Sequence, residues 1–212
     1  MSDSVLNRSW SAFPREVAPK YLKSFGSPSL ESKRLVYEVL KERGGKLPRI
    51  LDVGCGNANL AEYLDEQGLQ FNYTGTDFSD VLLEAAGAAF PGGTYVKADA
   101  GELAELPTDF DFAVYSHVIE MLPSPEASLS AAAKLAKSII IRFFEPPAER
   151  YDSVELLEMD VGGPKKVPYL RRKLSQSYYE LMLSNIGCRS VDVYRTGSKD
   201  QVHVLNFSVR QK

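Results

Sequence analysis

The feature that most restricts the fold of this chain is a regular alternation of short apolar runs with helical stretches. Five runs have the apolar or β-branched composition and the length of buried strands, at residues 50–53, 73–76, 94–96, 110–115 and 139–143. Helical stretches separate most of them, at residues 60–67, 81–90 and 125–137. Strands that alternate with helices pair in parallel through right-handed crossovers. The sequence therefore predicts an α/β, doubly wound open sheet with helices on both faces.

The C-terminal part departs from this alternation. A helix over residues 174–186 is followed by strands at 190–194 and 202–209, joined by the five residues from Thr196 to Asp200. This connection is far too short for a crossover between parallel strands. We therefore expect an antiparallel last strand, which completes a mostly parallel seven-stranded sheet.

Three other stretches are less regular. Residues 30–44 read as a helix that ends at two glycines, inside an expected N-terminal helical lid segment over residues 1–45. Residues 102–106 suggest a helical turn or two, and Ser124 is expected to cap the helix that follows it. Residues 145–173 are rich in Pro, Gly and basic residues, without an assigned element, and are a candidate substrate lid on the core over 46–212.

Composition limits the partners and the compartment. The chain has 212 residues, 44% of them hydrophobic, which suits one domain with an ordinary core. Its 25 basic and 28 acidic residues give a formal charge of −3, so no nucleic-acid partner is expected. We see no membrane-spanning run or secretory signal and expect a cytoplasmic protein. Two cysteines, Cys55 and Cys188, and two histidines predict neither a disulfide framework nor a metal site.

The most informative segment is ILDVGCGNANL at residues 50–60, where an apolar strand passes through a glycine turn into a helix. Gly54 and Gly56 allow the backbone to turn tightly and to touch a ligand at the carboxyl end of the strand. A dinucleotide-binding turn would carry a third glycine at position 59, which is Asn59, and Asp52 would repel a pyrophosphate. The segment favours a nucleoside ligand without phosphate.

Two more acids follow strands. Asp77 ends the second strand, 25 positions after Asp52, close to the spacing at which a carboxylate meets ribose hydroxyls. Phe78 beside it can pack on an adenine ring, and Asp99 ends the third strand. Asp is also common at strand ends and helix caps for purely structural reasons. Because parallel strands end at one edge of a sheet, we expect the three acids to share a cleft.

These residues give the chain a resemblance to the class I, Rossmann-like, S-adenosylmethionine-dependent methyltransferases of small molecules. Their first motif is DxGxGxG, which reads DVGCGNA here, with Ala58 in place of the third glycine. The resemblance covers roughly residues 46–212 and implies S-adenosylmethionine as the cofactor. It implies that Asp52 acts on the cofactor's ammonium, directly or through water, and that Asp99 binds the adenine amino group. The full set of expected cofactor-binding residues is Asp52, Gly54, Cys55, Gly56, Asp77, Phe78, Asp99, Ala100 and Ser116.

The fourth strand ends in FDFAVYSHVIEML, which looks like the family's motif beneath the transferable methyl group. His117 is therefore the candidate catalytic residue, because an imidazole can take a proton from a hydroxyl or amine acceptor. It is equally open that His117 caps a helix with Glu120, or that catalysis needs only in-line positioning. His203, in the last strand, is expected to be a surface or sheet residue without a role.

Acceptor contacts are expected from whatever covers the edge of the sheet. Trp10 and Tyr21 in the N-terminal segment are candidates, although they can also be ordinary packing of a helix on the core. Arg142 and Arg172 raise the possibility of an anionic acceptor, against the alternative of a solvated basic face. The sequence does not specify the acceptor, the methylated atom or the oligomeric state.

Two other functions stay open. One is a catalytically silent subunit that binds the cofactor and serves regulation or assembly. The other is an NAD(P)-dependent oxidoreductase, against which Asn59 and the antiparallel hairpin argue. Methyltransferases of nucleic-acid amino groups usually carry an NPPY-like segment after the fourth strand, where this chain has SHVIEML. The expected acceptor is therefore a small molecule.

Overall fold

The computed structural model describes residues 15–16, 18, 31–103, 105–107, 109–160, 166–197 and 199–207. The main sheet is built from β1 (Arg49–Val53), β2 (Asn72–Asp77), β3 (Thr94–Lys97), β4 (Phe110–Ser116), β5 (Ala136–Phe143), β8 (Ser190–Arg195) and β9 (Gln201–Asn206). The helices are α3 (Glu31–Arg43), α4 (Asn59–Glu66), α5 (Asp80–Ala89), the short 3-10 helix η1 (Ile119–Met121), α6 (Pro125–Leu135) and α7 (Gln176–Asn185). A separate hairpin consists of β6 (Ser153–Asp160) and β7 (Lys166–Lys173).

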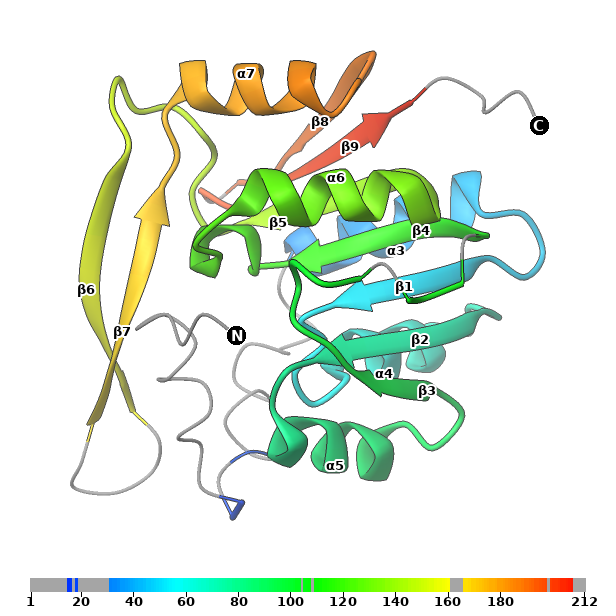
Figure 1. The fold of residues 1–212 in the computed structure, drawn as a ribbon. Helices are drawn as coiled ribbons and strands as arrows, with labels where there is room; N and C mark the ends of the chain where they lie inside the picture. The colour runs from blue at the N-terminus through cyan, green and yellow to red at the C-terminus, as the bar shows by residue number, and fades with distance from the viewer. Residues whose placement is uncertain are drawn as a thin grey trace.

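The main sheet has seven strands in the order β3-β2-β1-β4-β5-β9-β8 (Figure 1). Strand β9 pairs antiparallel with both β5 and β8, and the remaining neighbours pair in parallel. The predicted doubly wound, mostly parallel sheet with an antiparallel last strand is confirmed. The order reverses next to β1, where β4 lies on one side and β2 on the other, and open α/β sheets bind ligands at such a switch point.

Alternate side chains of the strands build two cores, one on each face of the sheet. Leu51 and Val53 of β1 pack with buried residues of α6 and α7. Ile50 of the same strand packs with buried residues of α3, α4 and α5. Figure 1 shows α6 in front of the sheet and α3 behind it. This division explains why the central strands read as continuous apolar runs, since they are buried on both faces.

Several predicted boundaries need correction. The helix expected over 125–137 ends at Leu135, and Ala136 already begins β5. Pro125 occupies the first turn of α6, but the Ser124 side chain makes no capping hydrogen bond. The last strand ends at Asn206, and residues 208–212 lie outside the described part. Residues 102–103 and 105–106, the described members of that stretch, are not in a helix, but the Leu106 N–H donates to the Leu103 carbonyl at 3.1 Å and closes a single turn.

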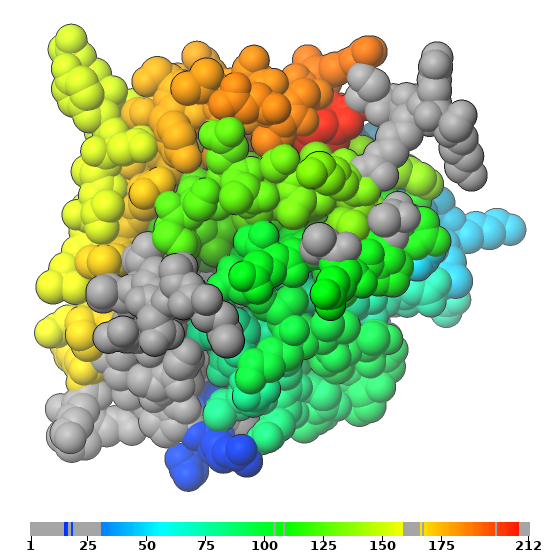
Figure 2. Space-filling view, viewed as in Figure 1, coloured from blue at the N-terminus to red at the C-terminus, as the bar shows by residue number. Residues whose placement is uncertain are grey.

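The stretch over 145–173 is not irregular, as the sequence suggested, because most of it forms the β6–β7 hairpin. Glu155 pairs in register with Arg171, and its carboxylate lies 3.1 Å from that guanidinium and 2.9 Å from the Lys173 ammonium. The opposite face exposes Val154 and Leu156. Strand β7 packs on η1, and the hairpin forms a rim along one side of the molecule (Figure 2).

The N-terminal segment is described mainly from α3 onward. This helix contacts β5 and β9, so it packs on one face of the sheet. Trp10 and Tyr21 lie outside the described residues. Within the part of the chain that the structure describes, each helix is too short or too polar to cross a bilayer.

Candidate active site

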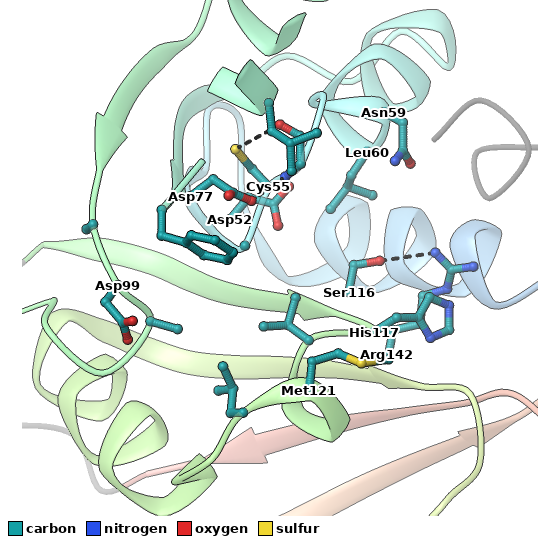
Figure 3. Close-up of a pocket in the computed structure, with 18 of the residues that line it drawn as sticks. Asp52, Cys55, Asn59, Leu60, Asp77, Asp99, Ser116, His117, Met121 and Arg142 are labelled. Atoms are coloured by element: carbon teal, nitrogen blue, oxygen red, sulfur yellow. Dashed lines mark hydrogen bonds between the residues drawn. The ribbon is translucent and has the colours of Figure 1, made fainter. Parts of the chain in front are cut away.

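One pocket opens at the carboxyl ends of the parallel strands (Figure 3). Every residue that the sequence predicted for cofactor binding lines this pocket, together with two further candidates. These residues are Asp52, Gly54, Cys55, Gly56, Asp77, Phe78, Asp99, Ala100 and Ser116, with His117 and Arg142. The strand order thus brings residues separated by up to 90 positions to a single cavity, as the shared sheet edge requires.

The turn between β1 and α4 needs left-handed backbone at three positions. Gly54 has φ of 69°, and a Cβ atom there would lie 2.7 Å from Cγ2 of Val118. Gly56 has φ of 56°. Ala58, in place of the family's third glycine, has φ of 61°, where a side chain costs about 1–2 kcal/mol. The chain therefore keeps the glycine-type turn even where it lacks a glycine.

Asp52 reaches the pocket from the end of β1. Its Oδ2 accepts a hydrogen bond of 2.7 Å from the Tyr73 hydroxyl. Its Oδ1 is buried and has no hydrogen-bond partner among the described residues. Burial raises the pKa of Asp52 to about 7, since a charged carboxylate is costly away from water. A positively charged donor in the pocket would satisfy Oδ1 and stabilise the ionised form.

Asp77 joins the glycine turn to the next helix. Its carboxylate accepts backbone N–H groups from Gly56 at 3.1 Å and from Ser79 at 2.9 Å. Burial raises its pKa to about 6, although these hydrogen bonds oppose the shift. Asp99 similarly accepts the N–H of Gly101 at 2.9 Å. Both acids therefore organise local backbone as well as lining the pocket.

His117 follows β4 directly and has an unusual backbone. Its φ is 60°, and its N–H donates to the carbonyl of Arg142 at 2.9 Å, which holds it against the end of β5. Non-glycine residues rarely adopt such angles, and they gather at functional sites. The imidazole stacks on Phe144 with the ring centres 3.6 Å apart.

The electrostatic surroundings keep this imidazole neutral. Burial lowers the pKa of His117 well below its usual value, and the charges of Arg142 and Arg171 act in the same direction. Nε2 lies 3.8 Å from Oδ2 of Asp200. Nδ1 is buried and makes no hydrogen bond within the part of the chain that the structure describes. Its lone pair or its hydrogen is therefore available to a ligand.

Glu120 does not cap a helix with His117, which removes that alternative. Its Oε1 instead accepts the backbone N–H groups of Phe144 at 3.0 Å and of Glu145 at 3.2 Å. Glu120 thus holds the backbone of Phe144, whose ring stacks on His117. Burial raises the pKa of Glu120 to about 8.

The two arginines suggested for the acceptor have different surroundings. Arg142 lines the pocket, and its guanidinium donates to the Ser32 hydroxyl at 2.8 Å. It also donates to the Ser116 hydroxyl at 3.1 Å (Figure 3). Arg172 lies on β7 opposite Val154, on the hairpin face turned away from Tyr169, and does not line the pocket. His203 is a sheet residue as expected, but it is buried and bonds to the Tyr179 hydroxyl at 2.9 Å.

Nine lining residues were not predicted. Val118, Met121 and Leu122 belong to the HVIEML segment, whose apolar residues immediately after a strand were a usable signal. Tyr169 comes from the β6–β7 hairpin, and no sequence pattern near it indicated a place in the pocket. The remaining residues are Asn59, Leu60, Leu82, Ala98 and Phe144.

A family profile described as a methyltransferase domain matches residues 13–189, which is most of the chain. The chain belongs to this family. The methyltransferase resemblance carried by DVGCGNA is therefore confirmed, and the methyltransferase fold places that motif at the pocket.

Two curated relatives and one solved structure are similar to this methyltransferase domain. A trans-aconitate 2-methyltransferase of Rhizobium rhizogenes is 39% identical over 80 residues, covering 37% of this chain and 30% of that protein. A ubiquinone biosynthesis O-methyltransferase of Dechloromonas aromatica is 35% identical over 98 residues, covering 42% and 40%. The chain spans less than half the length of these two relatives. The SAM-bound amino pentose methyltransferase CalS10 of Micromonospora echinaspora superposes with a TM-score of 0.67 at 14% identity, covering 87% of this chain and 94% of that one.

Proposed function

We propose that this protein is an enzyme that binds S-adenosylmethionine and transfers its methyl group to a small molecule. The observation that carries the proposal is the meeting of Asp52, Asp77 and Asp99 in one pocket around a left-handed glycine turn. Three carboxyl groups suit the ammonium, hydroxyl and amino groups of an adenosyl amino acid. They do not suit a pyrophosphate.

The residues present fit this cofactor. Oδ1 of Asp52, buried and without a partner among the described residues, would accept the ammonium group. The missing Cβ at Gly54 makes room for Val118 beside the turn, and Asp77 would take the ribose hydroxyls. Phe78, Asp99 and Ala100 would surround the adenine. When bound, the cofactor supplies an electrophilic methyl group on a sulfonium.

His117 is the proposed general base on the acceptor side. The imidazole is neutral because of its lowered pKa, and its Nδ1 has no partner within the described chain. In the tautomer that carries its hydrogen on Nε2, Nδ1 can take a proton from an acceptor hydroxyl or amine. Phe144 and Tyr169 would exclude water beside it. If the acceptor carries no proton to be removed, in-line positioning alone would account for the rate.

The small-molecule class of the acceptor is supported by the names of the relatives, which concern trans-aconitate and ubiquinone biosynthesis. The formal charge of −3 does not favour a nucleic acid. We further propose that residues 46–212 form the catalytic core, that residues 1–45 and the 145–173 segment act as lids, and that the protein works in the cytoplasm.

Calorimetry with S-adenosylmethionine and with NAD⁺ and NADP⁺ tests the cofactor. We expect the protein to bind S-adenosylmethionine and neither nicotinamide nucleotide. Binding of NAD⁺ or NADP⁺ without S-adenosylmethionine would favour an oxidoreductase. Formation of S-adenosylhomocysteine with pooled small-molecule acceptors tests turnover. Tight cofactor binding without turnover across such pools would favour the silent regulatory or assembly subunit.

A further inference from the structure

Arg142 is an almost fully buried cation in the wall of the pocket, with 2% of its surface exposed. It stands at the end of β5, beside Ser116 of β4 (Figure 3). We infer that Arg142 forms a binding site for a carboxylate group of a ligand in this pocket. The inference rests on the proposed function and adds to it the chemistry of one ligand group.

The hydrogen bonds of the guanidinium leave one nitrogen for a ligand. Nε and Nη1 donate to the hydroxyls of Ser32 and Ser116, which fixes the plane of the group. Nη2 is buried and has no hydrogen-bond partner among the residues that the structure describes. The nearest acid, Asp200, lies 3.9 Å from it, beyond hydrogen-bond distance. A buried N–H group without a partner is costly, and an incoming oxygen would remove that cost.

The charges around Arg142 favour an anion. Lys33 of α3 is also buried, and burial together with the charge of Arg142 lowers the pKa of Lys33 to about 8. The acids that act on Arg142 are Asp200 and Glu120, and those that act on Lys33 are Glu62, Glu66 and Asp52. Burial raises the pKa of Glu120 to about 8 and that of Asp52 to about 7, so both are largely or partly protonated near neutral pH. Glu120 therefore offsets little of the charge of Arg142, and Asp200 offsets it only from 3.9 Å.

A carboxylate fits this position better than a phosphate. Three acids, Asp52, Asp77 and Asp99, line the same pocket and would repel a dianion. A carboxylate carries one charge in a plane that matches the planar guanidinium. It can come from two sources, the methionyl group of the cofactor or an acidic acceptor.

The first arm of the test compares two cofactor analogues by calorimetry. S-adenosylhomocysteine carries the carboxylate, and 5′-deoxy-5′-methylthioadenosine lacks the whole amino-acid group. If the cofactor supplies the carboxylate, Arg142→Gln should weaken S-adenosylhomocysteine binding at least about tenfold and leave the second analogue unchanged. Arg172→Gln, outside the pocket, is the matched control and should change neither.

The second arm uses protein saturated with S-adenosylhomocysteine, titrated with trans-aconitate, succinate and benzoate and with their methyl esters. If the acceptor supplies the carboxylate, at least one acid should bind the natural protein better than its ester. Arg142→Gln should then weaken the binding of that acid at least about tenfold, while the first arm shows no change.

An unchanged result in both arms would overturn the inference. Failure of the natural protein to bind S-adenosylhomocysteine would instead contradict the proposed function, so the two failures are distinguishable. Melting curves establish that each variant is folded. If Arg142→Gln does not fold, Arg142→Lys takes its place, because lysine keeps the positive charge but lacks the planar set of donors. The inference still requires that this variant loses carboxylate binding in one of the two arms.

Discussion

The two halves of the pocket are built in different ways. The half around the ends of β1, β2 and β3 consists of the glycine turn and of acids that directly follow or end a strand. The half around the ends of β4 and β5 combines His117 and Arg142 with Tyr169 of the hairpin, beside Asp200 of the β8–β9 connection. The first half depends on local backbone geometry, and the second depends on contacts between distant segments.

On the proposed function, this difference separates recognition of the cofactor from recognition of the acceptor. Local turns leave few choices of residue, because a left-handed backbone or a close approach excludes most side chains. Contacts between distant segments allow many choices, so one fold can accept many substrates. Substitutions in the first half should therefore reduce cofactor binding. Substitutions in the second half should spare it, except at Arg142 if that residue binds the carboxylate of the cofactor.

The largest effect is expected for Gly54→Ala. The new Cβ would lie 2.7 Å from Val118 at a positive φ, so strain and overpacking together should cost about 2–5 kcal/mol. The free energy of unfolding and the affinity for S-adenosylmethionine should both fall. Gly45→Ala is a matched control, because Gly45 has φ of 70° and a Cβ atom there would have nothing within 4 Å of it. Equal losses in the two variants would contradict the close approach at Gly54.

His117→Asn should slow methyl transfer by about 100-fold or more while cofactor affinity stays the same. Asn tolerates the left-handed backbone of this position but cannot take the proton. The rate is measured in a single turnover with an identified acceptor, and calorimetry measures the cofactor affinity. His203→Asn, in the sheet and away from this pocket, is the control. A small effect on the rate would assign catalysis to positioning alone.

Asp77→Ala should weaken S-adenosylmethionine binding by about 1.5–3 kcal/mol, through lost hydrogen bonds to the ribose. Asp80→Ala provides the comparison, because Asp80 is exposed and pairs only with the exposed Lys97 in the described ion pairs. Calorimetry measures the affinity of both variants for S-adenosylmethionine. Unchanged affinity in Asp77→Ala would leave Asp77 as a residue that only holds the turn through Gly56 and Ser79.

The smallest effect is a dependence on pH. The pKa of Asp52 is raised to about 7, and the ammonium needs the ionised carboxylate, so affinity should fall by up to about tenfold per unit below pH 7. The stability of the ligand-free protein should change in the opposite direction. The folded state retains a proton that the unfolded carboxyl loses near pH 4, so stability declines as the pH rises from about 4 to 7.

Calorimetry in buffers of different ionisation enthalpy would detect the proton released on binding below pH 7. Denaturant unfolding across the same range measures the stability. Asp52→Asn should flatten both profiles, because an amide does not titrate in this range. Profiles that are unchanged in this variant would assign the proton to another group, such as Asp77, whose pKa is raised to about 6.

Much of the fold was predictable because its signals are short-range. Apolar runs indicated the five parallel strands, β1 to β5, and the short connection after Arg195 required an antiparallel β9. The β6–β7 hairpin was not predictable from alternation. Val154 and Leu156 are exposed, and the opposite face is polarised by ion pairs such as Glu155 with Arg171. Its strands therefore lack the apolar-in, polar-out pattern of a half-buried sheet.

The amino-acid sequence alone was enough to specify the proposed cofactor half of the pocket, around the ends of β1, β2 and β3. DVGCGNA and the acids at the strand ends specify local backbone and a common sheet edge, and both follow from a few adjacent residues. The proposed acceptor half could be known only from the assembled fold, in which Ser32, Arg142 and Asp200 come together across 168 positions of the chain. Such contacts join residues that are far apart in the sequence. Their strength depends on burial and on distance in space, and no local sequence pattern indicates either.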